Sequence, residues 1–171
     1  MTFILKYKIY PCLFLFILLS CSTDKTEKML AYEGISFNYP RSWNIETEEL
    51  SEESFFIKAK NRDDVMFITF TDNKTDLKEY IKTYYRKIDN TKVQLSTEPI
   101  ADSKFGKYDA LSSKFLITYL TTRTYGSVQT FEAGGKYILI VKQSDTEGRV
   151  QRNFKVIEES FSVETNKDSI N

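Results

Sequence analysis

Few side chains in this chain belong to the types that carry out chemistry. The 171 residues include no histidine, and the two cysteines are Cys12 and Cys21. Histidine is the commonest general base and metal ligand, and a thiolate is a strong nucleophile. The sequence also lacks a phosphate-binding glycine loop, a serine-hydrolase elbow and zinc-ligand spacing. We therefore expect no enzyme, no catalytic residue, no cofactor and no metal.

Paired carboxylates are the remaining candidates for a metal or catalytic site. Asp63 with Asp64, and Asp145 with Glu147, would supply the oxygen ligands that Ca²⁺ prefers. Neither pair has the alternating spacing of a calcium loop, and roles in turns and helix caps explain both. A hydrolase that uses only two facing carboxylates is a third hypothesis, but the sequence places no such pair.

Aromatic side chains are abundant and offer a different kind of site. Five of them could line a ligand groove: the single tryptophan, Trp43, and the tyrosines Tyr80, Tyr84, Tyr85 and Tyr125. Filling the core is the commoner role of such side chains.

Cys21 carries the most specific chemical prediction. Lys6 and Lys8 precede an apolar run at residues 9–19, and the sequence Leu-Leu-Ser-Cys follows at residues 18–21. A positive segment, an apolar run of about eleven residues and a small residue before the cut are typical of a secretory signal. The run is shorter than the roughly 20 residues of a spanning helix. Residues 18–21 resemble a bacterial lipobox.

The lipobox resemblance implies that residues 1–20 are a signal peptide and that Cys21 bears thioether-linked lipid. Two or three acyl chains would anchor the protein stably to a membrane. Cleavage removes Cys12, so the mature chain would hold no disulfide. Ser22 rather than aspartate follows the cysteine, which favours the outer membrane facing the periplasm, with surface exposure as an open alternative. An ordinary cleaved signal with a chance cysteine is the competing interpretation.

The mature composition predicts one domain with no nucleic-acid partner. Without Lys6 and Lys8, 22 basic residues face 24 acidic ones, so no basic excess is available to neutralise phosphates. About 150 residues suit a single domain. We expect a flexible tether at 21–31, the domain at 32–163 and a polar tail at 164–171.

Hydrophobic periodicity predicts a sheet-rich domain with two helices. Strands are expected at 35–39, from Trp43, and at 54–60, 65–71, 92–100, 106–120, 123–131 and 136–142. Helices are expected at 76–88 and from about 145 to 159, each with an apolar stripe along one side. The strand at 136–142 is apolar on both faces, so both faces must be covered, and the two helices are the natural covers.

The first helix also has a basic side, at Lys78, Lys82, Arg86 and Lys87. Such a side is usually a solvated surface, and docking onto acidic lipid or a partner is the alternative.

Three segments resemble the PsbP-like domain, a superfamily that includes the Ran-binding Mog proteins. They are Gly-Ile-Ser-Phe-Asn-Tyr-Pro-Arg-Ser-Trp at 34–43, Lys-Tyr-Ile-Leu-Ile at 136–140 and Ile-Glu-Glu-Ser-Phe at 157–161. The resemblance covers about residues 32–161. It implies an α/β/α sandwich around a mainly antiparallel sheet of about six or seven strands. The segments with which the photosystem members touch their partner have no match here.

Members of that superfamily are mostly binding or assembly factors. The resemblance and the lipobox together predict a lipid-anchored, non-catalytic binding or assembly module of the cell envelope, with an envelope protein or a small ligand as partner. A small-ligand carrier in the periplasm is the alternative, and a deep apolar pocket would favour it.

Overall fold

The computed structural model describes residues 27–89 and 93–164. The predicted signal peptide at 1–20, the lipid acceptor Cys21 and the tail from residue 165 lie outside the described residues. Their predictions are therefore untested by the structure.

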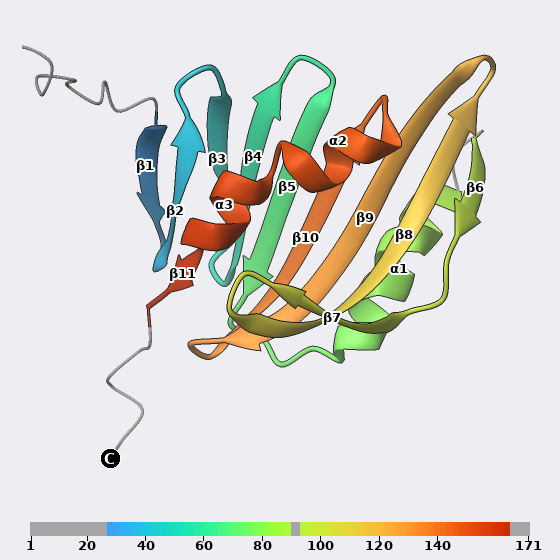
Figure 1. Cartoon of the computed structure of the whole chain (residues 1–171). Coiled ribbons are helices and arrows are strands. Elements are labelled where there is room, and N and C mark those ends of the chain that lie inside the picture. The colour runs from blue at the N-terminus through green and yellow to red at the C-terminus, as the bar shows by residue number, and fades with distance from the viewer. Residues whose placement is uncertain (1–26, 90–92, 165–171) are drawn as a thin grey trace, which may run out of the picture.

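A large antiparallel sheet forms the body of the domain (Figure 1). Its strands follow the order β3-β4-β5-β10-β9-β8-β6, and β7 pairs beside β6 along the outer edge of β8. The strands are β3 (Asn44–Ser51), β4 (Ser54–Asn61), β5 (Asp64–Thr71), β6 (Gln94–Thr97), β7 (Ala101–Phe105), β8 (Tyr108–Tyr119), β9 (Thr122–Ala133) and β10 (Lys136–Ser144).

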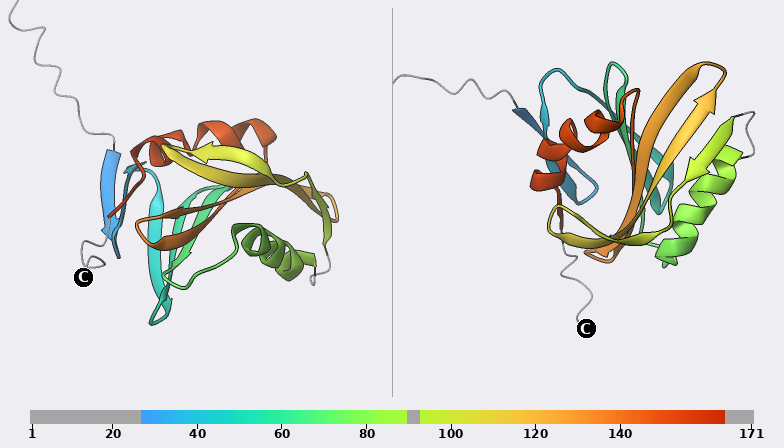
Figure 2. Two further views of the ribbon diagram at one scale, coloured as in Figure 1. Left: turned by 90° about the horizontal axis from the view of Figure 1, so that it is seen from below. Right: turned by 45° about the vertical axis from the view of Figure 1, so that its right-hand side comes forward.

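A second, three-stranded sheet has the order β1-β2-β11. Its strands are β1 (Glu27–Tyr32), β2 (Ile35–Pro40) and β11 (Ser162–Val163). The helices are α1 (Leu77–Asp89), α2 (Glu147–Arg152) and α3 (Lys155–Ser160). Seen along the strands, α1 lies on one face of the large sheet, and α2 and α3 lie on the other (Figure 2).

Strand β10 lies in the middle of the large sheet, between β5 and β9, as its two apolar faces predict. Ile138 and Ile140 point to the α3 side and are fully buried. Leu139 and Val141 point to the α1 side, where they pack with Ile81 of the helix. The expected helix on each face is confirmed.

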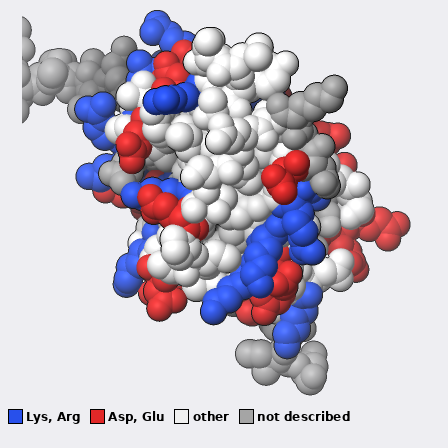
Figure 3. All heavy atoms as spheres, turned by 90° about the vertical axis from the view of Figure 1, so that its right-hand side faces the viewer, with Lys and Arg blue, Asp and Glu red and all other residues white. Residues whose placement is uncertain are grey.

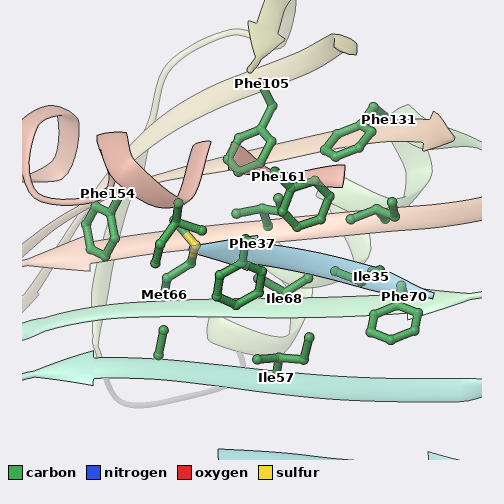
Figure 4. Close-up of a cluster of buried hydrophobic side chains, with 14 of the residues drawn as sticks. Ile35, Phe37, Ile57, Met66, Ile68, Phe70, Phe105, Phe131, Phe154 and Phe161 are labelled. Atoms are coloured by element: carbon green, nitrogen blue, oxygen red, sulfur yellow. The ribbon is translucent and has the colours of Figure 1, made fainter. Parts of the chain in front are cut away.

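The core on the α3 side is the larger of the two and is rich in phenylalanine (Figure 4). Phe161, just after α3, stacks on Phe37 of β2 at 6.1 Å between ring centroids. It also meets the ring of Phe105 edge-on at 5.2 Å. These contacts join the small sheet, the C-terminal segment and the β7–β8 hairpin, so residues far apart in sequence form one core.

Helix α1 begins at the predicted cap. The carboxylate of Asp76 accepts a hydrogen bond from the backbone N–H of Glu79 at 2.8 Å. The Glu79 carboxylate pairs with Lys82 and Arg86 rather than returning to the cap. On the buried side, Tyr85 donates a hydrogen bond to Ser113 of β8 at 2.8 Å, which fixes the helix to the sheet.

The fold differs from the predicted sandwich in four places. The large sheet has eight strands instead of six or seven, and a second sheet covers part of it. Strand β1 begins at Glu27, inside the stretch predicted as a tether, because it pairs with β2 over its whole length. Strands β7 and β11 have no counterpart among the predicted strands.

The fourth difference is the second helix, which is divided into α2 and α3. Asn153 ends α2, where its backbone N–H donates to Arg149 and its side chain donates to Asp64 at 2.6 Å. This hydrogen bond to a buried carboxylate on a distant strand fixes Asn153 at the break between α2 and α3. Local periodicity carries no information about such a partner.

Gly126 of β9 makes room for the side chain of its cross-strand partner on β8, Phe115. The ring of Phe115 lies across it, so that a Cβ atom at Gly126 would stand only 2.1 Å from the ring. Phe115 in turn packs on Tyr84 and Tyr85 of α1.

We expect Gly126→Ala to lower the free energy of unfolding by about 1–3 kcal/mol, because the added methyl group overpacks a buried ring. Urea denaturation followed by circular dichroism measures this. Gly148→Ala in α2 is the matched control, since nothing closer than 3.9 Å surrounds its Cβ position. It should leave stability unchanged or raise it by up to about 1 kcal/mol. Equal losses in both variants would contradict the packing argument.

Candidate functional site

The α3-side face of the large sheet changes character along its strands. On β9 the side chains on this face read Phe131, Gln129, Ser127 and Tyr125 toward the hairpin tip. Phe131 belongs to the core that α3 and the small sheet cover. Beyond it the face becomes polar, and only α2 overlies it from the side. The apolar core that α3 and the small sheet cover therefore ends between Phe131 and Gln129.

A half-open pocket of about 340 Å³ lies over this polar part of the sheet. Its floor comes from β8, β9 and β10, and its rim comes from α2 and β6. The lining residues are Ser96, Thr97, Glu98, Ser112, Lys114, Phe115, Leu116, Tyr125, Gly126, Ser127, Gln129, Lys142, Glu147 and Val150.

Two polar atoms in this wall are buried and lack a hydrogen-bond partner within the described residues: Ser127 Oγ and Gln129 Oε1. Gln129 is only 6% exposed. Its amide nitrogen donates to the backbone carbonyl of Lys104 at 3.0 Å, which fixes the orientation of the carboxamide. A buried acceptor left unpaired costs about 1–3 kcal/mol. The two residues that carry these atoms line one pocket, which makes it a candidate site for a hydrogen-bonding ligand.

Lys142 of β10 closes the inner end of the pocket beside Ser127, its register partner on β9. Its ammonium group donates to Glu158 of α3 at 2.7 Å and lies 5.7 Å from the centre of the Phe105 ring. The lysine side chain is 8% exposed and the glutamate side chain is 22% exposed. Because its charge is already matched, Lys142 adds little unpaired positive charge to the pocket.

The remaining charges at the rim are one ion pair and one further carboxylate. Lys114 faces Glu98 at 3.9 Å, and Glu147 of α2 also lines the pocket. Because Lys142 is paired with Glu158, the rim has one carboxylate in excess, while the two unpaired buried atoms belong to a hydroxyl and an amide. This arrangement favours an uncharged or zwitterionic group over an anion.

One member of each carboxylate pair that the sequence offers as metal ligands, Asp64 or Asp145, has a structural role. Asp64 is buried and accepts hydrogen bonds from Ser144 and Asn153, both at 2.6 Å. Asp145 accepts from Arg149 of α2 at 3.0 Å. Across residues 27–89 and 93–164, no group of three or more acidic side chains is arranged to hold a metal ion.

The aromatic candidates divide between core and pocket. Trp43 is buried edge-on against Phe154, 5.3 Å between ring centroids. Tyr80, Tyr84 and Tyr85 lie between α1 and the sheet. Of the five aromatic candidates, Tyr125 alone lines the pocket.

Burial also determines the acid–base behaviour of the helix tyrosines. It raises the pKa of Tyr80 to about 12. It raises the pKa of Tyr85 to about 12 as well, although the hydrogen bond with Ser113 opposes this shift. Both phenols therefore stay protonated near neutral pH, so they serve packing and hydrogen bonding rather than proton abstraction.

The basic side of α1 is a surface partly matched by acidic neighbours. Lys82 pairs with Glu79 at 2.6 Å, and Arg86 reaches the same carboxylate at 3.3 Å. Figure 3 shows this side of the molecule, with a broad uncharged area beside a stripe of basic side chains. The pairing fits the prediction of a solvated helix face.

The functional residues that sequence reasoning missed are Ser127, Gln129 and Lys142. All three lie in predicted strands. A signal was available, because polar residues replace apolar ones on one face of 123–131 and 136–142. Strand pairing was needed to show that these positions are neighbours.

Comparison with solved structures places the chain among PsbP-like folds. A Bacteroides thetaiotaomicron VPI-5482 crystal structure matches 82% of this chain with a TM-score of 0.56 and 17% identity, and the chain spans 50% of that protein's length. Cyanobacterial PsbP (CyanoP) from Synechocystis sp. PCC 6803 matches 81% of this chain and 93% of its own, with a TM-score of 0.59 and 12% identity.

LpqN of Mycobacterium tuberculosis, involved in cell envelope biogenesis, matches 80% of this chain and 90% of its own at a TM-score of 0.45 and 12% identity. No protein-family profile and no curated protein sequence matches the chain. The similarity to CyanoP, with a TM-score of 0.59 at 12% identity, supports the PsbP-like fold and extends to the fold alone. None of the helices in the described part of the chain is long and apolar enough to cross a membrane.

We expect Ser127→Ala to leave the free energy of unfolding unchanged or to raise it by about 1 kcal/mol, because it removes a buried hydroxyl that has no partner. Ser113→Ala, on the opposite face of the neighbouring strand, is the matched control. Its hydroxyl bonds both Tyr85 and the carbonyl of Glu98, so its loss should cost about 1–3 kcal/mol. Thermal denaturation compares the two, and a similar loss in Ser127→Ala would show that its hydroxyl is satisfied in the native protein.

Proposed function

We propose that this protein is a lipid-anchored, non-catalytic binding module of the cell envelope that recognises its partner through the pocket beside α2. The observation that carries the proposal is the pair of buried, unpartnered atoms, Ser127 Oγ and Gln129 Oε1, in one pocket wall. Leaving such buried atoms without a hydrogen bond lowers the free energy of unfolding. A ligand that forms hydrogen bonds to them removes this penalty on binding.

The chemistry of the wall defines the group that fits. Gln129 Oε1 is an acceptor, so the ligand must offer an N–H or O–H donor. Ser127 can donate or accept, and it lies next to Gln129 along the same face of β9. Leu116, Tyr125 and Val150 supply apolar contact around these polar atoms. An uncharged amide or hydroxyl group on a partly apolar stem meets these conditions.

The shape of the pocket favours a partner that projects a group into it. At about 340 Å³ the pocket is near the lower limit of small-molecule sites, and its open side leaves a ligand partly in solvent. A side chain or chain end of an envelope protein would occupy it while the rest of that protein contacts the rim. This geometry suits an accessory or assembly role.

A periplasmic small-ligand carrier is the second candidate, because the unpaired atoms would accept a small molecule as well as a protein group, although the half-open, polar pocket is not the deep apolar pocket that would favour a carrier. In that case the ligand is a small molecule with the same donor chemistry, released rather than held by a protein. The two candidates share the pocket and differ in the molecule that carries the donor group.

We expect Gln129→Leu in the full-length lipoprotein to reduce capture of the partner by about tenfold, the equivalent of one hydrogen bond of about 1.4 kcal/mol. In-cell crosslinking followed by mass spectrometry of the envelope fraction measures capture.

Gln143→Leu is the matched control for this experiment. It removes an amide from the neighbouring strand, but that amide faces α1 and donates to Tyr84 at 3.1 Å. Capture should therefore survive. Equal capture by wild type and Gln129→Leu would refute the pocket as the binding site. If instead native mass spectrometry finds a small molecule that Gln129→Leu loses, the carrier is the correct function.

The anchor is tested separately. We expect Cys21→Ser to shift the protein from the membrane fraction to the soluble or precursor fraction, because the acceptor thiol for lipid is gone. Cell fractionation with immunoblotting measures the shift, and a globomycin-type block of lipoprotein processing provides an independent check. A variant that stays membrane-bound and is still cleaved would contradict lipid anchoring.

A further inference from the structure

The two ends of the domain differ, and strand registers define them. Glu27 at the start of β1 pairs with Pro40, which leads into the turn before β3. Asn61 pairs with Asp64 across the β4–β5 turn, and Tyr119 pairs with Thr122 across the β8–β9 turn. Figure 1 shows all three turns at the end where β1 begins. We call this the anchor end.

The chain itself ties this end to the membrane if the anchor of the proposed function is present. Five residues lie between Cys21 and Glu27, so six residue-to-residue steps connect the two. Even fully extended, they span no more than about 20 Å. Strand β8 alone has 12 residues, or about 40 Å of length. The start of β1 therefore stays within about 20 Å of the bilayer, whereas the opposite end lies a strand length further along the domain.

Exposed arginines without an acidic partner mark the anchor end. Arg41 and Arg62 lie in two of its turns, and Arg123 is the second residue of β9, directly after the third turn. None of the three forms an ion pair with another described residue. Glu27 and Asp63 are exposed at the same end, so each arginine would act as an individual ligand rather than as part of a net basic surface. Phospholipid headgroups attract such unpaired arginines.

The tip of the β8–β9 hairpin adds an apolar contact at the anchor end. Leu120 is 83% exposed and Tyr119 is 54% exposed, and both are among the few large hydrophobic side chains exposed in the described domain. Leu120 also has a backbone φ of +54° in a two-residue turn, a conformation that favours glycine or asparagine. An exposed leucine in a strained position gains nothing from the fold itself. Figure 3 shows that the uncharged surface of this side extends up to the tip.

We propose that the anchor end rests on the phospholipid surface, with Tyr119 and Leu120 entering the interface and Arg41, Arg62 and Arg123 binding anionic headgroups. Tyrosine suits the boundary between headgroups and acyl chains, and leucine suits the layer beneath it. This contact rests on the lipid anchor of the proposed function and adds to it a defined orientation. The long strands then run away from the membrane, and the opposite end, with exposed Glu33, Glu52 and Glu53, projects into the aqueous phase.

Site-specific fluorescence tests the orientation. The mature chain holds no cysteine other than Cys21, so Leu120→Cys and Glu52→Cys each create one labelling site. The full-length lipoprotein variants carry an environment-sensitive dye in vesicles of equal parts phosphatidylethanolamine and phosphatidylglycerol. We expect a blue shift and quenching by a lipid-borne quencher for the dye at position 120, and neither effect for the dye at position 52.

Two further variants separate contact from folding. Leu120→Asn relieves the strained turn and removes the apolar side chain, so the non-lipidated domain should fold at least as well and bind these vesicles less. Replacing Arg41, Arg62 and Arg123 by glutamate should weaken quenching of a dye at position 119 and abolish its salt dependence. Undiminished vesicle binding by Leu120→Asn would overturn the role of the tip.

The possible failures are distinguishable. If the lipoprotein floats with the vesicles but the dye at position 120 is not quenched, or both positions are quenched equally, the orientation is wrong and the anchor stands. If it does not float with them, the lipid anchor fails, and the surface contact that depends on it fails with it.

Discussion

The fold depends on one constraint, which is that strand β10 is apolar on both faces. A strand of this kind must be covered on both sides, so the large sheet cannot stand with one face in water. Helix α1 covers one side through Ile81, while α3, the small sheet and Phe161 cover the other. The aromatic stacking of Phe161 on Phe37 joins β2 to the residue between α3 and β11. The two covers therefore connect elements from the beginning and the end of the described domain.

The candidate site arises where this cover ends. Beyond Phe131 the sheet continues toward the hairpin tip, but the short α2 does not extend across it (Figure 1). Gln129, Ser127 and Lys142 occupy positions on the sheet that further toward α3 belong to phenylalanine and isoleucine. A continuous second helix would pack differently along the sheet. The break at Asn153, held by buried Asp64, thus shapes both the fold and the pocket rim.

The pocket and the anchor end are separate features of the same strands. The pocket lies on the α3-side face of β8 and β9, and the exposed hairpin tip lies at the end of the same two strands. A domain that rests on this end would present the pocket sideways, close to the bilayer. That position suits recognition of another envelope component more than exchange with the bulk solvent. Fold similarity to CyanoP bears on neither feature, because it establishes the arrangement of elements alone.

The sequence by itself determined most strands, helix α1 with its cap at Asp76, and the double burial of β10, because these depend on local periodicity and side-chain type. Only the tertiary structure decided which polar strand residues remain unpaired. Gln129 and Ser113 are both polar residues within predicted strands, and the sequence does not distinguish their roles. In the structure, Ser113 hydrogen-bonds to Tyr85 and Glu98, while Gln129 Oε1 has no partner in the described domain. It also decided that residues 147–160 form two helices and that β1 starts at Glu27. Each of these outcomes depends on contacts between segments that are distant in sequence. The local pattern of apolar and polar residues carries no information about such contacts.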